Sequence, residues 1–213
     1  MIANTALRHV VVAATGDLMG LKGLIVNLVV RRVKKLVPAW SLPGHIKFNN
    51  ALREGARATL TPVTQTPDDV AFLQYTGGTT GVSKGAMLTH RNLVANVIQS
   101  EVWLAPGRRN RPDIGQLVTV VALPLYHVFA LTVCCMLSIR TGGLGVLIPN
   151  PRDISGMIKE LKGISINTFP AVNTLYNALL NNPAFNTLDF SKLIAANGVT
   201  VTKNASVQSE RPC

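Results

Sequence analysis

A run of glycine and hydroxyl side chains occupies residues 75–85, which read YTGGTTGVSKG. Glycine lets backbone amide groups approach an anion closely, threonine and serine hydroxyls add hydrogen-bond donors, and Lys84 adds a positive charge. An apolar stretch of strand type, residues 70–75, comes directly before the loop. The loop therefore leaves the end of a strand, where α/β proteins bind their ligands, and the combination predicts a polyphosphate site.

The spacing of this run excludes two well-known phosphate loops. A Walker A loop needs a glycine, four residues and then Gly-Lys-Ser/Thr. Counting from Gly77 or Gly78 places Val82 or Ser83 where the second glycine belongs. The dinucleotide pattern G-x-G-x-x-G fails here too, and fails again at residues 142–145.

The run instead resembles the phosphate-binding signature of the adenylate-forming enzymes, a Thr/Ser/Gly-rich loop that ends in a small residue and then Lys-Gly. Two further segments extend the likeness: residues 123–131 read LPLYHVFAL and residues 150–154 read NPRDI. Together with residues 74–92, they resemble the bacterial long-chain fatty-acyl-CoA synthetases, also called long-chain fatty acid–CoA ligases. The resemblance covers roughly residues 6–196, so a glycine loop of no special function is improbable.

The resemblance implies an activity and its cofactors. Enzymes of this family join a fatty acid to CoA: the carboxylate attacks the α-phosphate of ATP to give acyl-AMP and pyrophosphate, and the CoA thiol then displaces AMP. The resemblance therefore implies ATP, Mg²⁺ and, as co-substrate, CoA, with Thr80 at the metal. The implied nucleotide contacts are Tyr75, Thr76, Gly77, Gly78, Thr79, Thr80, Gly81, Ser83, Lys84 and Gly85.

Two residues are candidates for catalysis. Charge builds on the phosphates in the first step, so Lys84 is expected to act by electrostatic stabilisation. His127 follows the expected strand end at Leu123, and by resemblance it lies beside the acyl-adenylate carbonyl. A lone histidine is usually structural, but the matching Pro-Leu-Tyr-His context favours a functional one.

The resemblance also implies a substrate site. Phe129 and Leu131 would line the acyl channel, although apolar residues there are equally typical of an ordinary core. Asn173 and Thr174 resemble the pocket wall more weakly. The substrate-binding candidates are His127, Phe129, Leu131, Asn173 and Thr174.

Composition limits the other possibilities. The chain has 213 residues with 47% hydrophobic content, enough for one large domain or two small ones, and a formal charge of +11. No recognised nucleic-acid module occurs, so we expect no nucleic-acid partner. The three cysteines show no disulfide or metal-binding spacing, and residues 1–6 lack the pattern of an export signal. We therefore expect a cytoplasmic protein.

Positive charge concentrates near the start of the chain. Residues 21–36 show a helical stripe of apolar side chains that Val26 and Val30 close on the opposite face. A basic run follows at Arg31, Arg32, Lys34 and Lys35. Such a helix could lie on an anionic membrane, on the inner face, or it could be covered by a partner segment, and both alternatives stay open.

The remaining elements alternate in the way of an α/β protein. Expected strands are residues 9–14, 70–75, 85–88, 118–123, 144–148, 164–169 and 192–196. Expected helices are residues 21–36, 50–58, 129–140, 154–161 and 172–181, of which the helix 154–161 is capped by Asp153. A further helix is expected to begin after its cap Thr89, with an apolar face at Leu93, Val94, Val97 and Ile98. Loops are expected at residues 59–69 and 105–115. This order predicts a mostly parallel sheet with crossover helices, which the resemblance implies is part of the large N-terminal domain.

One long apolar stretch needs a separate interpretation. Residues 117–139 contain no Lys, Arg, Asp or Glu, which is typical of a transmembrane span. Pro124 divides the stretch, and Tyr126 and His127 would place polar groups in mid-membrane. We therefore expect a buried strand, a loop at residues 124–127 and a buried helix.

The resemblance ends near the C-terminus. Residues 199–213 match none of the motifs that follow in the family, and we interpret them as a frameshifted or disordered tail. Residues 1–198 are then expected to be a partial AMP-binding (adenylation) domain. We expect this chain alone to be an incomplete catalyst, and the alternative is a non-enzymatic nucleotide- or membrane-binding remnant.

Overall fold

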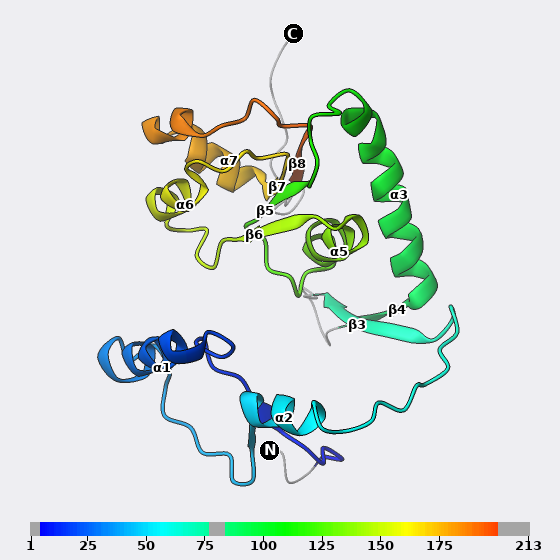
Figure 1. Ribbon diagram of the computed structural model, residues 1–213, viewed down its shortest axis with the longest axis vertical. Coiled ribbons are helices and arrows are strands. Elements are labelled where there is room, and N and C mark those ends of the chain that lie inside the picture. The colour runs from blue at the N-terminus through cyan, green and yellow to red at the C-terminus, as the bar shows by residue number, and fades with distance from the viewer. Residues whose placement is uncertain (1–4, 77–83, 200–213) are drawn as a thin grey trace. The chain divides into compact units, whose positions relative to one another are not determined.

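The computed structural model describes residues 5–76 and 84–199 of the chain (Figure 1). The chain divides into two compact units, residues 1–64 and residues 65–213. Each unit has its own helices and strands.

The first unit is small, and its helices are longer than its strands. It contains β1 (Val11–Val12), α1 (Gly20–Leu28), the π-helical turn η2 (Val29–Val33), β2 (Ile46–Lys47) and α2 (Phe48–Gly55). The predicted helices at 21–36 and 50–58 are therefore present with shifted ends. The strand predicted over residues 9–14 is only two residues long, because its parallel partner β2 is equally short. Val11 is exposed, so the prediction that this strand is buried is wrong.

The second unit contains the main sheet. Its strands are β3 (Val70–Thr76), β4 (Lys84–Thr89), β5 (Val118–Val121), β6 (Leu144–Leu147), β7 (Thr168–Val172) and β8 (Ala195–Val199). Its helical segments are α3 (His90–Arg109), α4 (Val128–Ala130), η3 (Leu131–Met136), α5 (Leu137–Thr141), α6 (Ile154–Leu161), α7 (Asn173–Leu180) and η4 (Pro183–Thr187). Four strands form a parallel sheet in the order β6-β5-β7-β8, and β3 pairs antiparallel with β4. This arrangement confirms the predicted α/β class.

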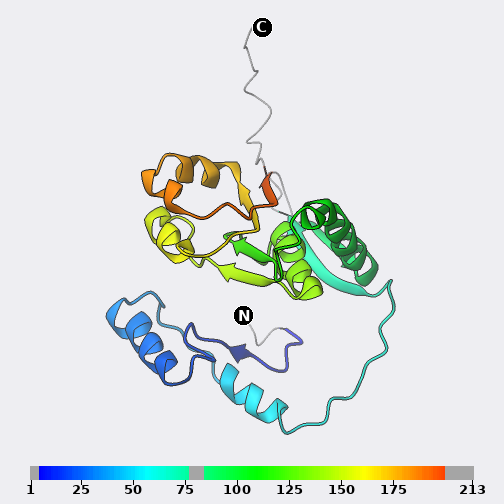
Figure 2. The same ribbon diagram turned by 45° about the horizontal axis from the view of Figure 1, so that its top comes forward.

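Helices cover both faces of the parallel sheet (Figures 1 and 2). Val120 of β5 and Phe169 of β7 belong to the large apolar core that α6 and α7 complete. Val121 points to the opposite face, where it packs with Ala130 and Cys134. Alternate side chains of one strand are thus buried on both sides, as parallel sheets require.

A buried asparagine joins the strands of this sheet. The Asn167 side chain accepts a hydrogen bond from the Val118 backbone amide at 2.8 Å and donates one to the Lys192 carbonyl at 3.0 Å. The Asn167 amide also donates to the Val118 carbonyl at 3.0 Å. Only one register pair, Thr119 with Thr168, links β5 to β7, and the bonds between Asn167 and Val118 extend that link.

Capping residues in the sequence correctly predicted where some helices begin. Helix α6 begins after Asp153, whose carboxylate accepts from the Gly156 amide at 2.9 Å, as predicted. Helix α3 begins with a capping box in which Thr89 and Asn92 each accept from the other's backbone amide. The prediction of a loop over residues 105–115 is partly wrong, because α3 continues through Pro106 to Arg109.

The apolar face predicted for α3 is only half buried. Leu93 and Val97 are buried, whereas Val94 and Ile98 are exposed. The stretch 117–139 forms β5, a loop and the α4–η3–α5 helical segment. Among the described residues, no helix has both the length and the apolar character needed to cross a bilayer.

Replacing Asn167 by alanine should destabilise the second unit. The change leaves the Val118 amide and the Lys192 carbonyl without their partner, so we expect the free energy of unfolding to fall by about 2–4 kcal/mol. Urea unfolding followed by circular dichroism measures the change. The control is Asn177→Ala, an exposed position on α7 where a loss near zero is expected. Equal losses for the two variants would contradict the role assigned to Asn167.

Candidate functional site

The β3–β4 hairpin holds the two ends of the predicted phosphate loop together. In its register, Tyr75 lies opposite Gly85 and Thr76 lies opposite Lys84. The loop residues Gly77, Gly78, Thr79, Thr80, Gly81 and Ser83 lie outside the described residues. What the structure provides is therefore a pair of hydrogen-bonded strands from which the loop starts and to which it returns.

Gly85 leaves room for an aromatic ring. A Cβ atom at this position would lie 3.2 Å from Cζ and 3.3 Å from Cε1 of Tyr75, closer than most side chains tolerate. The Tyr75 ring therefore lies across the backbone of Gly85, and it remains largely exposed. This contact places a flat aromatic surface next to Lys84, at the start of the Lys-Gly pair.

His127 lies in the loop that follows β5. Its backbone amide donates to the Pro124 carbonyl at 2.9 Å, which closes a tight turn. Its Nδ1 accepts a hydrogen bond from the Phe129 amide at 3.3 Å and so caps the α4–η3–α5 segment. Because Nδ1 is the acceptor, the neutral ring carries its proton on Nε2, where it can donate to a ligand.

Asn173 and Thr174 lie at the start of α7, directly after β7, and both are exposed. The Asn173 Oδ1 atom is 2.7 Å from the position that a Cβ on Gly198 would occupy, so it lies against β8. Strands β5 and β7 are neighbours, and the carboxyl ends of parallel strands share one edge of a sheet. The sheet order therefore brings the His127 loop and Asn173 to the edge where α/β sheets bind ligands.

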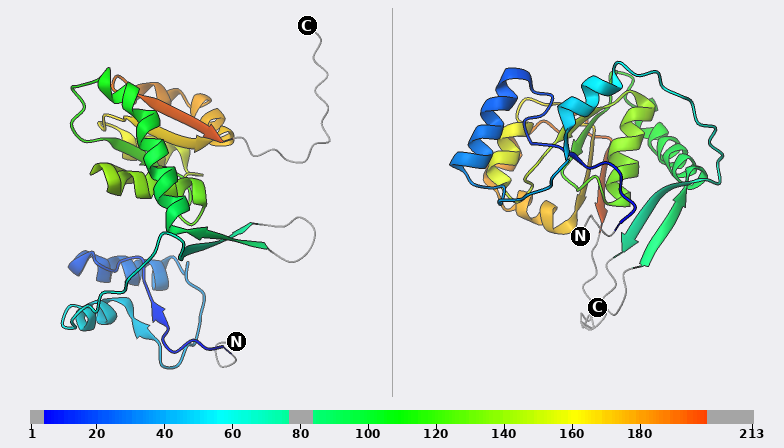
Figure 3. Two further views of the ribbon diagram at one scale, coloured as in Figure 1. Left: turned by 90° about the vertical axis from the view of Figure 1, so that its right-hand side faces the viewer. Right: turned by 90° about the horizontal axis from the view of Figure 1, so that it is seen from below.

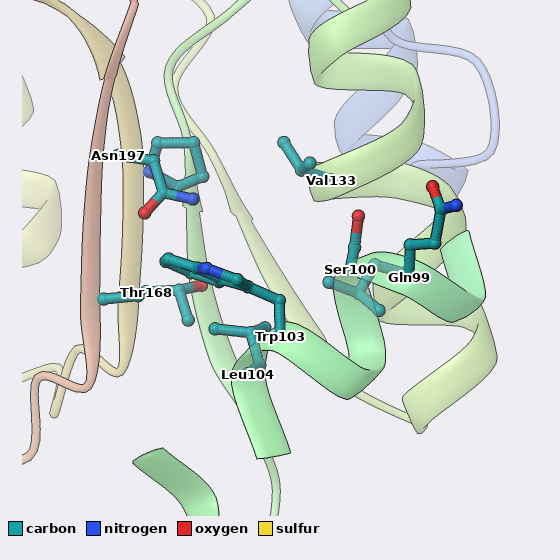
Figure 4. A pocket seen from close by; sticks show the side chains of 10 residues that line it. Gln99, Ser100, Trp103, Leu104, Val133, Thr168 and Asn197 are labelled. Atoms are coloured by element: carbon teal, nitrogen blue, oxygen red, sulfur yellow. The ribbon is translucent and has the colours of Figure 1, made fainter. Parts of the chain in front are cut away.

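A cavity of about 290 Å³ separates the sheet from α3 (Figure 4). Thr168 and Pro170 of β7 line it together with residues of β8, η3 and α5. Figure 4 shows Trp103 reaching from α3 toward Thr168 and Asn197. The cavity is thus an apolar space with a few polar groups, which is the usual character of a small-molecule site.

A second cavity, of about 450 Å³, lies along the same helix. Phe129 and Thr132 form one wall, and Leu88 of β4 forms another. Ser100 and Val133 line both cavities, so the two spaces are adjacent. The hairpin continues directly into α3 (Figure 3). Because α3 lines both cavities, it connects them to the strand that follows the phosphate loop.

The predicted site residues are thus distributed over three places. Tyr75, Lys84 and Gly85 lie on the hairpin, His127 and Phe129 follow β5, and Asn173 and Thr174 follow β7. Leu131 is half-buried in η3 and lines neither of the two cavities.

Sequence reasoning missed the contribution of α3. The residues Asn92, Asn96 and Ser100, four positions apart, face the second cavity. That spacing puts polar side chains on one helix face, which was the available signal.

The groups around the cavities are mostly neutral. Burial raises the pKa of the Cys134 thiol to about 12, so it is not a nucleophile at neutral pH. The buried hydroxyls of Thr119 and Thr168 share a hydrogen bond of 2.7 Å. Arg140 pairs with Glu101 at 3.0 Å on the surface and links α5 to α3. Among the described residues that line the two cavities, none is a Lys, Arg, Asp or Glu.

Comparison with known proteins gives a consistent result. The sequence profile of the AMP-binding enzyme family matches residues 2–206. A long-chain-fatty-acid–CoA ligase of Escherichia coli O6:H1 is 50% identical over 194 residues, which are 91% of this chain and 34% of that protein. The corresponding ligase of Haemophilus influenzae is 44% identical and covers 98% of this chain and 37% of its own length.

A solved structure supports the fold. The crystal structure of a fatty acyl-adenylate ligase from L. pneumophila, in complex with acyl adenylate and pyrophosphate, has a TM-score of 0.60 and 21% identity. It covers 78% of this chain and 29% of that one. The chain thus spans about a third of the length of the curated relatives it matches.

The capping role of His127 predicts a specific stability pattern. Replacing it by alanine removes the Nδ1 acceptor, so the free energy of unfolding should fall by about 0.5–1 kcal/mol. His127→Asn should lose less, because asparagine is itself a good N-cap residue. Urea unfolding of both variants measures this. If alanine and asparagine cost the same, the Nδ1 contact does not stabilise the helix.

Proposed function

The chain belongs to the AMP-binding enzyme family, and on that premise we propose that it carries the phosphate loop and part of the acyl site of an ATP-dependent long-chain fatty acid–CoA ligase. The proposed reaction converts fatty acid, ATP and CoA to acyl-CoA, AMP and pyrophosphate through acyl-AMP. The observation that carries the proposal is the hairpin register, which sets Thr76 opposite Lys84 at the two ends of the loop.

In this proposal the loop acts on the phosphates of ATP. Lys84 and the hydroxyls of Thr76, Thr79, Thr80 and Ser83 would donate to phosphate oxygens while the carboxylate attacks the α-phosphate. Negative charge moves onto the departing pyrophosphate in this step, so donors already in place lower the barrier without reorganising. The glycines of the loop let its backbone amides take part.

Magnesium fits the donor chemistry through one protein ligand. Within residues 5–76 and 84–199, no three His, Cys, Asp or Glu side chains gather as metal ligands. Mg²⁺ is commonly held by one or two protein oxygens together with substrate phosphates and waters. The hydroxyl of Thr80 would be such an oxygen, and the ion would neutralise phosphate charge when bound.

The acyl group is proposed to lie next to α3. His127 would donate from Nε2 to an oxygen of the acyl carboxylate or adenylate, and Phe129 opens onto the larger cavity beside it. The apolar lining of the two adjacent cavities suits a hydrocarbon chain. Asn173 and Thr174, and more remotely Leu131, would complete the wall at the edge of the sheet.

We also propose that the first unit associates with the inner face of the membrane, through Arg31, Arg32, Lys34 and Lys35. The supporting observation is that α1 leaves Leu21, Leu24, Ile25 and Leu28 exposed, between 58% and 82%. An exposed apolar helix followed by cations is typical of interfacial binding. We further propose that residues 1–198 are part of the AMP-binding domain and that residues 199–213 are a tail, although the family profile match extends to residue 206 and β8 ends at Val199.

The adenylation proposal is tested by exchanging segments. This chain is placed in the E. coli ligase in exchange for the segment that it matches, and pyrophosphate release with palmitate and ATP is measured. We expect the chimera to release pyrophosphate and this chain alone to release none. Lys84→Ala in the chimera should slow release by about 10²–10³-fold, because one positioned donor is lost.

The matched control for this test is Lys159→Ala, an exposed lysine at the end of α6. It should leave the rate unchanged. A Lys84→Ala chimera as fast as the Lys159→Ala chimera would remove Lys84 from the proposed mechanism, and an inactive chimera that folds and binds ATP would contradict the proposed function itself.

A further inference from the structure

A cleft of about 530 Å³ lies within the first unit, apart from the phosphate loop. Its walls come from α1 and η2, from the segment between η2 and β2, and from α2. Residues that bear on its chemistry are Leu28, Arg31, Arg32, Trp40, Lys47 and Arg53. None of these walls belongs to the site already described.

The floor of the cleft is fixed by Asp17. Its Oδ2 accepts from the Ala14 amide at 2.6 Å, and its Oδ1 accepts from the Asn49 side chain at 3.1 Å. Gly16 and Gly23 touch so closely that a side chain at Gly16 would collide with the Gly23 carbonyl. The turn at residues 14–17 is therefore held against both α1 and α2, and both Asp17 oxygens are already engaged.

The cleft contains a single carboxylate, Asp17, and neutral donors already occupy both of its oxygens. Arg31 and Arg32 come from η2, Lys47 precedes α2, and Arg53 lies in α2. Within residues 5–64, none of them forms an ion pair; Arg53 donates to the Asn50 side chain at 2.6 Å, which orients its guanidinium group. Four cations from three elements thus face one cleft beside a single, already bonded carboxylate.

The same cleft has an apolar side. Leu24 and Leu28 precede Arg31 and Arg32 on one face of the α1–η2 helix, at spacings of four and then three or four residues. Both leucines are exposed, although they line the cleft. Trp40 stands edge-on to His45, with ring centroids 5.0 Å apart. Tryptophan is enriched where hydrocarbon meets water.

We propose that this cleft binds the phosphate group of an anionic phospholipid, with Arg31, Arg32, Lys47 and Arg53 around the phosphate and Leu24 and Leu28 against the acyl region. Arginine suits phosphate because its guanidinium group donates two parallel hydrogen bonds. The apolar stripe beside the cations is the reason to choose a lipid over a free phosphate. This inference rests on the proposed membrane association and adds two residues, Lys47 and Arg53, outside the basic run.

Vesicle sedimentation of the whole chain tests the inference. Vesicles of phosphatidylcholine alone are compared with vesicles that also contain phosphatidylglycerol. The wild-type chain should bind the anionic vesicles, Lys47→Gln should bind roughly five-fold more weakly, and Lys47→Gln with Arg53→Gln roughly twenty-fold more weakly. Arg53→Lys keeps the charge and should retain most of the binding.

The control is Arg57→Gln, which removes an exposed cation of the same unit that does not line the cleft. It should weaken binding by less than about two-fold if the cleft is a defined site. Circular dichroism spectra that match the wild type show that each variant keeps its fold. A variant whose spectrum differs is replaced by Lys47→Met, which keeps the length of the side chain.

The outcomes separate the two proposals. If the wild-type chain does not bind anionic vesicles, the membrane association is wrong and the inference falls with it. If the wild type binds but Arg57→Gln costs as much as Lys47→Gln, the association is diffuse and the cleft is not the site. Soluble glycerol 3-phosphate serves as the competing ligand. If it binds saturably in the cleft and anionic vesicles fail to displace it, the cleft binds a free phosphate compound and the lipid proposal is wrong.

Discussion

The buried carboxamide of Asn167 reinforces the connection between β5 and β7. These two strands carry the loops of the candidate site, yet their ladder contains one register pair, Thr119 with Thr168. Asn167 adds a side-chain acceptor for the Val118 amide and a donor for the Lys192 carbonyl, at 2.8 and 3.0 Å. Because Asn167 is only 2% exposed, no water can replace these bonds cheaply. The alignment of the His127 loop with Asn173 at one edge of the sheet follows from this link.

Helix α3 connects the β3–β4 hairpin to the parallel sheet. Its first residue follows β4, and the Thr89 capping box fixes the direction in which it leaves the hairpin. Its buried face packs against α5 and β8 through Val97, Leu104 and Ala195. Near its other end, Gly107 approaches Ile194 so closely that a Cβ would lie 3.2 Å from the isoleucine Cβ. Helix α3 therefore runs from the hairpin to the sheet and lines both cavities.

Sequence patterns predicted those element boundaries that are determined by residues close to them in the sequence. Helix α6 has the bounds that Asp153 and the apolar period indicated, because cap and period lie within one short segment. Strand β7 was predicted to end before Pro170, but it continues through this residue. Its pair with β5 is at Thr168, two residues earlier, and from there to its end β7 pairs with β8. The motifs also indicated Lys84 and His127 as site residues, and these two roles stay predictions. No motif could indicate Trp103, whose place depends on how α3 packs across the sheet.

Ion pairs are distributed unevenly between the two units, and the net charge of the chain does not show this. In the second unit, carboxylates meet cations: Arg111 donates to Asp113 and lowers the pKa of that carboxyl to about 2, and Lys192 lies 3.5 Å from the same group. In the first unit, nine Lys and Arg residues accompany only Asp17 and Glu54. Asp17 is engaged by neutral donors, and no cation of the described residues 5–64 forms an ion pair. Cations that repel one another without a partner destabilise a folded unit, so their retention around one cleft is better explained by an anion that the unit binds than by folding alone.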